Sequence, residues 1–447
     1  MIPPRQQVAV LGYGKEGQSV QQHLRKLPGC QHARIVIIPR VTSNTPVQKI
    51  ARFDLLIRSP GIPLSLPLFS WARRRHIPIT SATNLFFAFL PKFFPKRKIK
   101  VIGVTGTKGK STTATLIARG LRSAGYITYL GGNIGTSPLS LLIRLRNDRA
   151  KIMRHPSPAM VVLELSSFQL QDLNASPSIA VVLDIFPDHL DVHRSIAEYY
   201  RAKRNIVQFQ NKRNLVVFCP KNRISTRIAA SSKGKHIPIT ESLIASFTKS
   251  LSRVDKPFLH NAAAAATVLS RLGVPRRTIE RTICSFRGLP HRLQLVHTTR
   301  ISPGRVRWYN DSAATNPTAA AAAIRSFSLP CTCILGGKSK HITYTPILHA
   351  VANHPSLQSI VLTGENRNEL KRVLAPLCRN LRIATTPTLQ QAVRHAIKDA
   401  SRFLAAHSSC HEYIILFSPG AASFDAFSSY RERGVVFQKL AKTVRLQ

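Results

Sequence analysis

One short run constrains this chain more than any other, because it places a glycine-rich loop between a strand and a helix. The run reads Val101-Ile-Gly-Val-Thr-Gly-Thr-Lys-Gly-Lys-Ser-Thr-Thr113. Residues 100–104 are apolar and mostly β-branched, whereas residues 112–121 carry apolar side chains at helical spacing, so the chain must turn between them. Glycines in such a turn let backbone N–H groups face a phosphate, beside the positive end of the helix dipole.

Two side chains at the end of this loop are suited to bind a nucleoside triphosphate and its Mg²⁺ ion. Lys110 would place a point charge near the β and γ oxygens, and Ser111, which opens the helix, would offer a hydroxyl to Mg²⁺. The strict pattern Gly-x4-Gly-Lys-Ser/Thr is not met, since Val104 stands at its first position. The alternative is a glycine turn with an exposed lysine, but the strand, loop and helix context favours a phosphate loop.

The remaining apolar segments divide the 447 residues into three α/β blocks, in line with the usual size of domains. The blocks cover residues 1–96, 97–296 and 297–447, and each alternates short strands with helix-like segments, which is typical of parallel sheets. We expect strands at residues 8–11, 34–38, 55–58, 77–79, 160–164, 180–184, 332–335, 359–363 and 413–418. A basic stretch with prolines, residues 91–100, is interpreted as a linker.

The net charge of +46, from 65 Lys and Arg against 19 Asp and Glu, suggests polyanionic partners. The basic residues are spread over the whole chain, however, and no aromatic residues interleave them as stacking platforms. We interpret most of this charge as a solvated surface that binds nucleic acid weakly and non-specifically at low salt. A basic nucleic-acid-binding protein with a phosphate loop is the alternative.

The cysteines and the hydropathy of the sequence indicate in which cellular compartment the protein works. The seven cysteines are scattered, and the closest pair, Cys331 and Cys333, lacks metal-ligand spacing, so we expect reduced thiols. The longest apolar run, residues 84–91, is far shorter than the roughly 18 residues that a membrane span needs. Because a strand is already expected at residues 8–11, we predict no secretory leader and a soluble, cytoplasmic protein.

A second glycine pattern follows the first expected strand. Gly12, Gly14 and Gly17 are spaced as Gly-x-Gly-x-x-Gly. Taken alone, this spacing suggests a dinucleotide site, but the acid that should follow about 20 residues later is missing. A tight strand-to-helix turn that faces some other phosphate is at least as well supported.

Acids are scarce, so their positions in the middle block are informative. Glu164 ends an expected strand, and parallel strands end at the same edge of a sheet as the phosphate loop. It could hold a hydrated Mg²⁺ or polarise a water, or it could be a surface acid. Asp184, Asp188 and Asp191 fall within eight residues around His189. On its own, His189 is equally well explained as a loop histidine.

Together these segments resemble the Mur ligase family, the ATP-dependent enzymes that add amino acids to peptidoglycan precursors. The likeness spans nearly the whole chain, and two elements resemble its D-glutamate-adding branch in particular: Glu164-Leu-Ser-Ser-Phe-Gln-Leu170 and Ser418-Pro-Gly-Ala-Ala-Ser-Phe-Asp425. The other matching segments are Thr105–Thr112, Gly131–Gly135, Asp188–Asp191, Tyr200–Lys203, His260–Asn261, Gly288–Arg292, Asn310–Pro317 and Leu335–Lys340.

The resemblance implies an α/β protein of three domains. Residues 1–96 would form a Rossmann-like domain for the UDP end of the substrate, residues 97–296 a central P-loop ATPase-type domain, and residues 297–447 a Rossmann-like domain for D-glutamate. The implied activity is ATP-dependent addition of D-glutamate to UDP-N-acetylmuramoyl-L-alanine through an acyl phosphate, by a cytoplasmic monomer with two Mg²⁺ ions. A folylpolyglutamate-type ligase is the alternative, which the segment Ser418–Asp425 disfavours.

The resemblance also assigns site residues. Catalytic roles fall on Lys110, His189 and Lys203, and metal-binding roles on Ser111, Glu164, His189 and Lys203, where Lys203 matches the lysine that this family carbamylates. ATP contacts fall on Thr105, Gly106, Thr107, Lys108, Gly109, Lys110, Ser111, Thr112, Asn261, Arg292 and Asp311. Among them, Asn261 matches an adenine contact, Arg292 a phosphate contact and Asp311 the ribose contact. Contacts to the UDP substrate fall on Gly12, Gly14, Gly17, Ser59, Pro60, Gly61 and Asn133. Contacts to D-glutamate fall on Thr315, Lys340, Ser423 and Phe424.

Three positions depart from the family pattern. Ala313 stands where the family has a lysine, Ala264 where it has a second adenine-contacting asparagine, and Ser339 where it has an aspartate. We expect these changes to affect turnover or ATP affinity rather than family membership.

Overall fold

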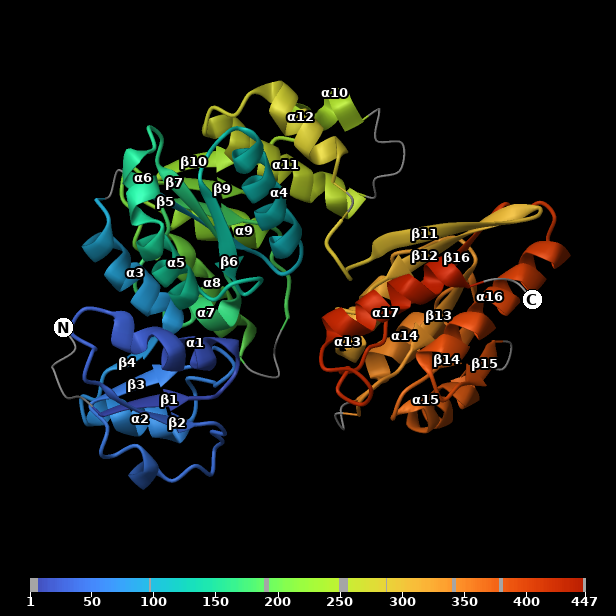
Figure 1. Ribbon diagram of the computed structural model, residues 1–447, viewed down its shortest axis with the longest axis horizontal. Helices are drawn as coiled ribbons and strands as arrows, with labels where there is room; N and C mark the ends of the chain where they lie inside the picture. Colours follow the sequence, from blue (N-terminus) through green and yellow to red (C-terminus); the bar gives the residue numbers. More distant parts are fainter. Residues whose placement is uncertain are drawn as a thin grey trace. The chain divides into compact units, whose positions relative to one another are not determined.

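The structure is a computed structural model that describes residues 7–95, 98–188, 193–248, 256–286, 288–339, 343–377 and 381–444. The chain divides into two compact units, with the division between residues 286 and 287. The first unit contains two β-sheets and the second unit contains one (Figure 1). The predicted α/β class with parallel sheets is confirmed.

The first sheet has four parallel strands in the order β2-β1-β3-β4. They are β1 (Gln7–Leu11), β2 (Arg34–Ile38), β3 (Leu55–Arg58) and β4 (Ile79–Ser81), close to the predicted ranges. Their helices are α1 (Lys15–His23), α2 (Pro67–Arg74) and α3 (Ala82–Phe93). The predicted linker is wrong at both ends. Residues 91–93 belong to α3, because Phe86 and Phe89 bury one face of this helix in the core, and residues 99–100 begin the next strand, β5 (Ile99–Thr105).

The second sheet has six parallel strands in the order β10-β9-β8-β5-β7-β6. The strands are β5 (Ile99–Thr105), β6 (Thr128–Gly132), β7 (Ala159–Glu164), β8 (Ile179–Val182), β9 (Leu215–Phe218) and β10 (Lys235–Pro238). The helices are α4 (Lys110–Ser123), α5 (Pro138–Asn147), α6 (Arg149–Arg154), α7 (Ser167–Leu170), α8 (Ile196–Gln208), α9 (Arg223–Ala230), α10 (Ser242–Thr248), α11 (Lys256–Arg271) and α12 (Arg276–Cys284).

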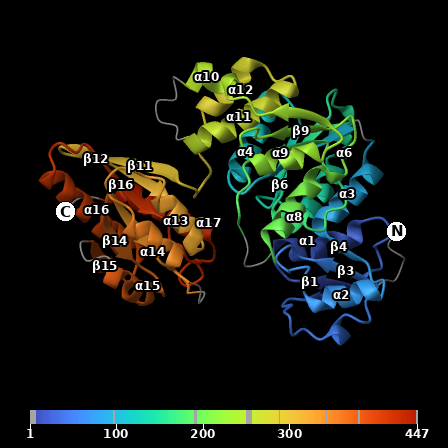
Figure 2. The same ribbon diagram turned by 180° about the vertical axis from the view of Figure 1, so that it is seen from behind.

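Helices cover both faces of this second sheet, which therefore separates two apolar cores. Val101 of β5 packs into one core with residues of α5 and α8, while Ile102 and Val104 pack into the other with residues of α4, α11 and α12. Figure 2 shows the same layers from behind. Because both faces are buried, the strands read as nearly continuous apolar runs rather than as alternating ones.

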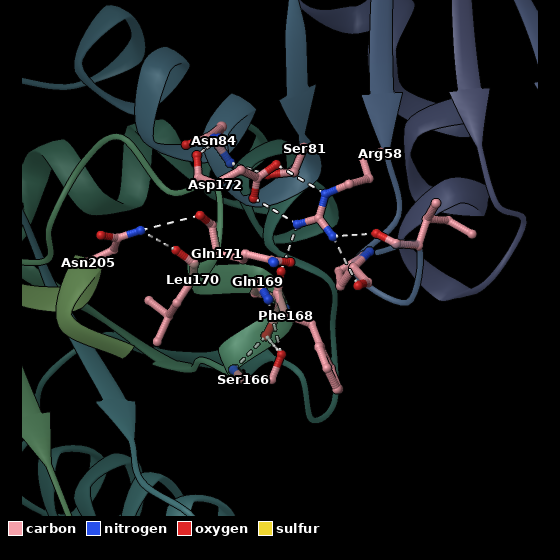
Figure 3. Close-up of polar contacts among 12 residues, drawn as sticks. Arg58, Ser81, Asn84, Ser166, Phe168, Gln169, Leu170, Gln171, Asp172 and Asn205 are labelled. Atoms are coloured by element: carbon pink, nitrogen blue, oxygen red, sulfur yellow. Dashed lines mark hydrogen bonds and ion pairs between the residues drawn. The ribbon is translucent and has the colours of Figure 1, made fainter. Parts of the chain in front are cut away.

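A buried arginine joins the first sheet to the second. Arg58, the last residue of β3, is 1% exposed, and its guanidinium donates two hydrogen bonds to the Asp172 carboxylate, of 3.3 Å and 2.9 Å (Figure 3). It also donates to the backbone carbonyls of Phe168 at 2.7 Å, of Pro60 at 3.1 Å and of Ile62 at 2.8 Å. One side chain therefore fixes both the loop after β3 and the segment around α7.

Two asparagines hold the same segment from either side (Figure 3). The Asn84 amide on α3 donates to the Asp172 carbonyl at 2.8 Å and accepts from the Asn174 N–H at 3.1 Å. The Asn205 amide on α8 donates to the Leu170 carbonyl at 2.8 Å. Helices that belong to both sheets thus fix the backbone between residues 168 and 174.

The C-terminal unit contains a mixed six-stranded sheet in the order β11-β12-β16-β13-β14-β15. Only the β11 to β12 pairing is antiparallel among the described strands. The strands are β11 (Gln294–Ile301), β12 (Gly304–Asn310), β13 (Cys331–Leu335), β14 (Leu357–Leu362), β15 (Arg382–Thr385) and β16 (Glu412–Phe417). The helices are α13 (Pro317–Ile324), α14 (Thr345–Ala352), α15 (Arg367–Leu374), α16 (Leu389–Ala406) and α17 (Tyr430–Thr443).

Removing one partner of the Arg58 pair should weaken the first sheet strongly. Arg58→Met leaves the Asp172 carboxylate, whose side chain is 11% exposed, without its cation, and we expect a loss of about 3–5 kcal/mol. The double variant Arg58→Met, Asp172→Leu should lose clearly less, because no unpaired charge remains. Hydrogen exchange of the amides in β1 to β4 measures this opening free energy. Equal losses in the single and double variants would contradict the buried-pair interpretation.

Candidate active site

The phosphate loop joins the end of β5 to the first turn of α4, as the sequence predicted. Gly106 and Gly109 have φ angles of +158° and +82°, which glycine adopts without a side-chain clash. The Lys110 ammonium donates to the backbone carbonyls of Gly106 at 3.0 Å and of Thr107 at 2.8 Å. Its charge therefore lies over the loop, at the N-terminus of α4.

Asn261, on α11, lies against this loop. A Cβ atom at Gly109 would come within 2.0 Å of the Asn261 amide oxygen, which also accepts a hydrogen bond of 3.4 Å from the Thr113 hydroxyl. The residue predicted to contact adenine is thus in contact with the phosphate loop itself. Ala264, one turn further along α11, is fully buried in the core.

Glu164 connects the phosphate loop to a further segment. Its carboxylate is 1% exposed, and it accepts from the Ser111 hydroxyl at 2.7 Å and from the Asn133 amide at 3.0 Å. The Asn133 N–H also donates to the Glu164 carbonyl at 2.8 Å. Because Mg²⁺ prefers oxygen ligands such as carboxylates and hydroxyls, the donor set of Ser111 and Glu164 fits the predicted metal position.

Lys203 is buried beside the same loop. It lies on α8 and is 1% exposed, and its Nζ donates to the Gly106 carbonyl at 2.8 Å and to the Thr105 hydroxyl at 3.4 Å. Burial, followed by repulsion from Lys110, lowers the pKa of Lys203 well below its usual value, although Asp188 and Glu164 oppose this shift. The Lys203 ammonium therefore loses its proton more readily than that of an exposed lysine.

The segment that follows β8 is also attached to the loop. The Thr107 N–H donates to the Asp184 carbonyl at 2.8 Å, and the Thr107 hydroxyl donates to the Phe186 carbonyl at 3.0 Å. The Thr107 and Tyr199 hydroxyls lie 3.0 Å apart. Tyr199 was not predicted, although it precedes Lys203 by one helical turn and so shares its face of α8. His189 and Asp191 lie outside the described residues.

The other three predicted ATP contacts of the loop region differ in exposure. Lys108 is exposed at the tip of the loop, whereas Thr112 is half-buried on α4. Thr105, at the end of β5, is buried, and its hydroxyl donates to the Leu165 carbonyl at 2.9 Å.

In the first sheet, the predicted UDP-binding residues lie on two segments that follow the neighbouring strands β1 and β3. Gly12 and Gly14 form the turn from β1 into α1, and Gly17 lies in the first turn of α1. The Ser59 hydroxyl donates to the Gly12 carbonyl at 2.9 Å. Gly12 has a φ of +86°, and a Cβ atom at Gly17 would come within 2.3 Å of the Gly12 carbonyl oxygen. Residues 59–61, which include Pro60 and Gly61, follow the neighbouring strand β3, so the sheet brings the two segments together.

Sequence reasoning missed an acid in this turn. Glu16 is 8% exposed and accepts a hydrogen bond of 2.6 Å from the Gln169 amide on α7. Burial raises the pKa of Glu16 to about 7. The only sequence signal was its place between Gly14 and Gly17, where a carboxyl group also faces the N-terminus of α1.

In the C-terminal unit, the residues predicted to contact D-glutamate belong to the chain segments that follow the adjacent strands β12, β16 and β13. The Gly420 N–H donates to the Ala314 carbonyl, and the Lys338 N–H donates to the Ala422 carbonyl, both at 2.9 Å. These bonds bring the three loops to one edge of the sheet. Thr315 is half-buried, Ser423 is buried, and Phe424 is 72% exposed, whereas Lys340 lies outside the described residues.

Asp311, the predicted ribose contact, is held rigidly at the same edge. It is 8% exposed and accepts from the Ser418 hydroxyl at 2.7 Å and from the Leu293 N–H at 3.2 Å. Burial raises the pKa of Asp311 to about 6. Arg292 precedes Leu293 and its side chain is exposed.

Two broader features accompany these sites. No helix in the described part of the chain is both long and apolar enough to cross a bilayer. The six cysteines that the structure describes are free thiols.

The chain is similar to known proteins along most of its length. The sequence profile of the Mur ligase middle domain matches residues 104–255, and that of the Mur ligase, glutamate ligase domain matches residues 291–403. The UDP-N-acetylmuramoylalanine--D-glutamate ligase of Symbiobacterium thermophilum is 32% identical, with 91% of this chain and 88% of that protein covered. The protein of the same name from Acetivibrio thermocellus is 31% identical, with 88% and 83% covered.

A solved structure supports the fold. The UDP-N-acetylmuramate-alanine ligase of Thermotoga maritima aligns with a TM-score of 0.50 and 14% identity, over 98% of this chain and 100% of that chain. At this identity, the likeness concerns the fold alone.

Gly109→Ala should impair nucleotide binding, because the new Cβ atom would displace Asn261 and strain the left-handed backbone. We expect the affinity for MgATP to fall at least about tenfold, or 1.4 kcal/mol. Gly273→Ala is the matched control, since Gly273 has a similar φ of +77° with nothing within 4 Å of its Cβ position. It should lower stability without changing MgATP affinity, as measured by calorimetric titration. Unchanged MgATP affinity in Gly109→Ala would contradict the assigned loop.

Proposed function

The chain belongs to the Mur ligase family, and we propose that it adds D-glutamate to UDP-N-acetylmuramoyl-L-alanine at the expense of ATP. The observation that carries this proposal is the set of hydrogen bonds that joins the buried Ser111 and Glu164 to Asn133 beside a phosphate loop. Relatives named UDP-N-acetylmuramoylalanine--D-glutamate ligase match about nine tenths of this chain. The sequence prediction of the family is thereby confirmed.

The chemistry begins with phosphoryl transfer. A carboxylate oxygen of the L-alanine moiety attacks the γ-phosphorus of ATP, the bond to the ADP oxygen breaks, and an acyl phosphate forms. Little covalent help is needed from the protein, since positioning and charge neutralisation are the main requirements. Lys110 and the N–H groups of residues 106–111 would bind the phosphates. Ser111 and Glu164 would hold Mg²⁺, which neutralises charge on the transferred group.

The second step forms the amide bond. The amine of D-glutamate attacks the acyl carbon through a tetrahedral intermediate, inorganic phosphate leaves with the electron pair of the broken C–O bond, and the nitrogen loses a proton to solvent. Asn133, which donates to Glu164, is proposed to orient the substrate at this point. We propose that Thr315, Lys340, Ser423 and Phe424 bind the D-glutamate carboxylates. We also propose that Asn261 contacts the adenine of ATP, Arg292 a phosphate and Asp311 the ribose.

Lys203 is proposed to act as a carbamate. The Lys203 ammonium would lose one proton, and the neutral amine would then add to CO₂ with loss of a second proton, which converts a cation into a carboxylate-like anion. Its burial and the repulsion by Lys110 favour the neutral amine that this reaction requires. The resulting oxygens would help to hold a second Mg²⁺ together with His189.

The first sheet is proposed to bind the UDP end of the substrate at Gly12, Gly14, Gly17 and residues 59–61. The glycine turn supports this proposal, because its backbone can approach a diphosphate closely at the N-terminus of α1. We further propose that the enzyme is a cytoplasmic monomer with small-molecule partners and without a specific nucleic acid or membrane partner.

A substrate panel tests the proposed reaction. Phosphate release from ATP and Mg²⁺ should require both UDP-N-acetylmuramoyl-L-alanine and D-glutamate. A folate acceptor with L-glutamate should give no release. Phosphate release that is indifferent to D-glutamate, alongside tight, salt-sensitive RNA binding, would instead favour the nucleic-acid alternative.

Lys203 variants test the carbamate. Lys203→Ala should lower turnover about a hundredfold or more while MgATP affinity stays close to normal, because the oxygens that would help to hold the second Mg²⁺ are lost from the site. Lys203→Arg should be equally inactive, since arginine keeps the charge but forms no carbamate. Small carboxylates in the buffer should partly restore the alanine variant.

The exposed Lys212 provides the control, and Lys212→Ala should retain full turnover. An active Lys203→Arg enzyme would rule out the carbamate and leave Lys203 as an ordinary cation.

A further inference from the structure

Three potential metal ligands that the proposed reaction does not use converge at one edge of the second sheet. Asp184 follows β8, Cys219 directly follows β9, and His260 lies on α11. β8 and β9 are parallel neighbours in which Val182 pairs with Phe218, so the chain segments that carry Asp184 and Cys219 leave the sheet side by side. The topology, rather than closeness in sequence, places these side chains together.

Their donor atoms are spaced for one ion. The His260 Nε2 atom lies 2.9 Å from the Cys219 Sγ atom and 3.3 Å from an Asp184 carboxylate oxygen, and the three donors lie within 4.8 Å of one another. A tetrahedral Zn²⁺ with ordinary bond lengths separates a nitrogen ligand from an oxygen or sulfur ligand by about 3.4–3.6 Å. Side-chain shifts of less than about 1 Å would therefore complete the coordination geometry.

We propose that Asp184, Cys219 and His260 form a binding site for a divalent cation that prefers thiolate and imidazole ligands, with Zn²⁺ as the reference ion. One thiolate, one imidazole and one carboxylate are a ligand set suited to Zn²⁺. They differ in kind from the all-oxygen pair of Ser111 and Glu164, so Mg²⁺ should not compete for them. Zinc binding here is independent of the substrate proposed above.

The surroundings of the three ligands also resemble those of metal sites. The other ring nitrogen of His260, Nδ1, faces the Glu241 carboxylate at 3.9 Å, and histidine ligands of zinc commonly direct their second nitrogen to a carboxylate. The Cys219 N–H donates to the Ser225 hydroxyl at 3.0 Å, which in turn donates to the Val182 carbonyl at 2.8 Å. These bonds hold the backbone at Cys219 in place.

Access and a fourth ligand position are both available. Cys219 is buried, whereas the side chains of His260 and Asp184 are 25% and 37% exposed. A cation can therefore enter from solvent on the side of His260 and Asp184. A water molecule can then supply the fourth ligand, as in zinc sites that have three protein ligands.

Binding at this cluster would act on the phosphate loop through two existing contacts. The Asp184 carbonyl accepts from the Thr107 N–H, and Asn261, the neighbour of His260, lies against Gly109. A metal ion that joins Asp184 to His260 would brace the loop from both sides. Because it binds only the folded arrangement of ligands, it should also raise the melting temperature of the unit that contains it.

Cobalt and zinc binding by the full chain test the site. The chelator-treated protein should bind one equivalent of Co²⁺ with a thiolate-to-cobalt charge-transfer band, and Zn²⁺ should abolish the band while excess Mg²⁺ should not. Cys219→Ala should lose the charge-transfer band, and its zinc affinity should fall by more than about a hundredfold. Glu241→Gln should lower the zinc affinity about tenfold. Cys284→Ala, which removes a half-buried cysteine outside the cluster, is the matched control and should behave as the unaltered chain.

Asp184→Asn, which changes a partly exposed side chain, provides a second variant should Cys219→Ala fail to fold. It should keep the charge-transfer band but bind Zn²⁺ at least about tenfold more weakly. Absence of a charge-transfer band in the unaltered chain, or a band that persists in Cys219→Ala, would overturn the proposal. Zinc affinity that is unchanged in Asp184→Asn would also overturn it.

Discussion

The buried carboxylate of Glu164 is the contact around which the proposed ATP site is organised. It accepts from Ser111 at the start of α4 and from Asn133 after β6, so three segments that are distant in sequence share one anion. Glu164 is 1% exposed, and burying a carboxylate costs folding free energy unless hydrogen-bond donors satisfy it. Each of these two hydrogen bonds therefore restrains the position of its donor. Lys110 and Lys203 place two further side-chain nitrogens around the same loop.

Arg58 extends this organisation to the first sheet. Its five hydrogen bonds link the loop after β3, where the UDP end is proposed to bind, to the segment that follows Glu164 along the chain. The apolar core is continuous across the same junction, since Val8, Phe86 and Leu142 belong to one cluster. The glycine turn at Gly12 and the phosphate loop are therefore parts of one compact unit.

Sequence patterns predicted the parts of the site that follow from local rules. The phosphate loop and the place of Glu164 follow from the strand-to-helix pattern and from the shared edge of parallel strands. β11 and β12 were missed because basic residues such as the exposed Arg300 and the half-buried Arg307 break their apolar pattern. The Arg58 to Asp172 pair was missed because a buried arginine has no local signature. The convergence of Asp184, Cys219 and His260 depends on strand order, which one sequence does not reveal.

Isotope transfer tests the central claim most directly. UDP-N-acetylmuramoyl-L-alanine labelled with ¹⁸O in both carboxylate oxygens is incubated with the enzyme, MgATP and D-glutamate, and the released phosphate is analysed by mass spectrometry. Attack of the carboxylate on the γ-phosphorus followed by amide formation predicts one ¹⁸O atom in each phosphate and one in each new amide carbonyl. Unlabelled phosphate would contradict the proposed acyl phosphate and, with it, the ligase chemistry assigned to this site.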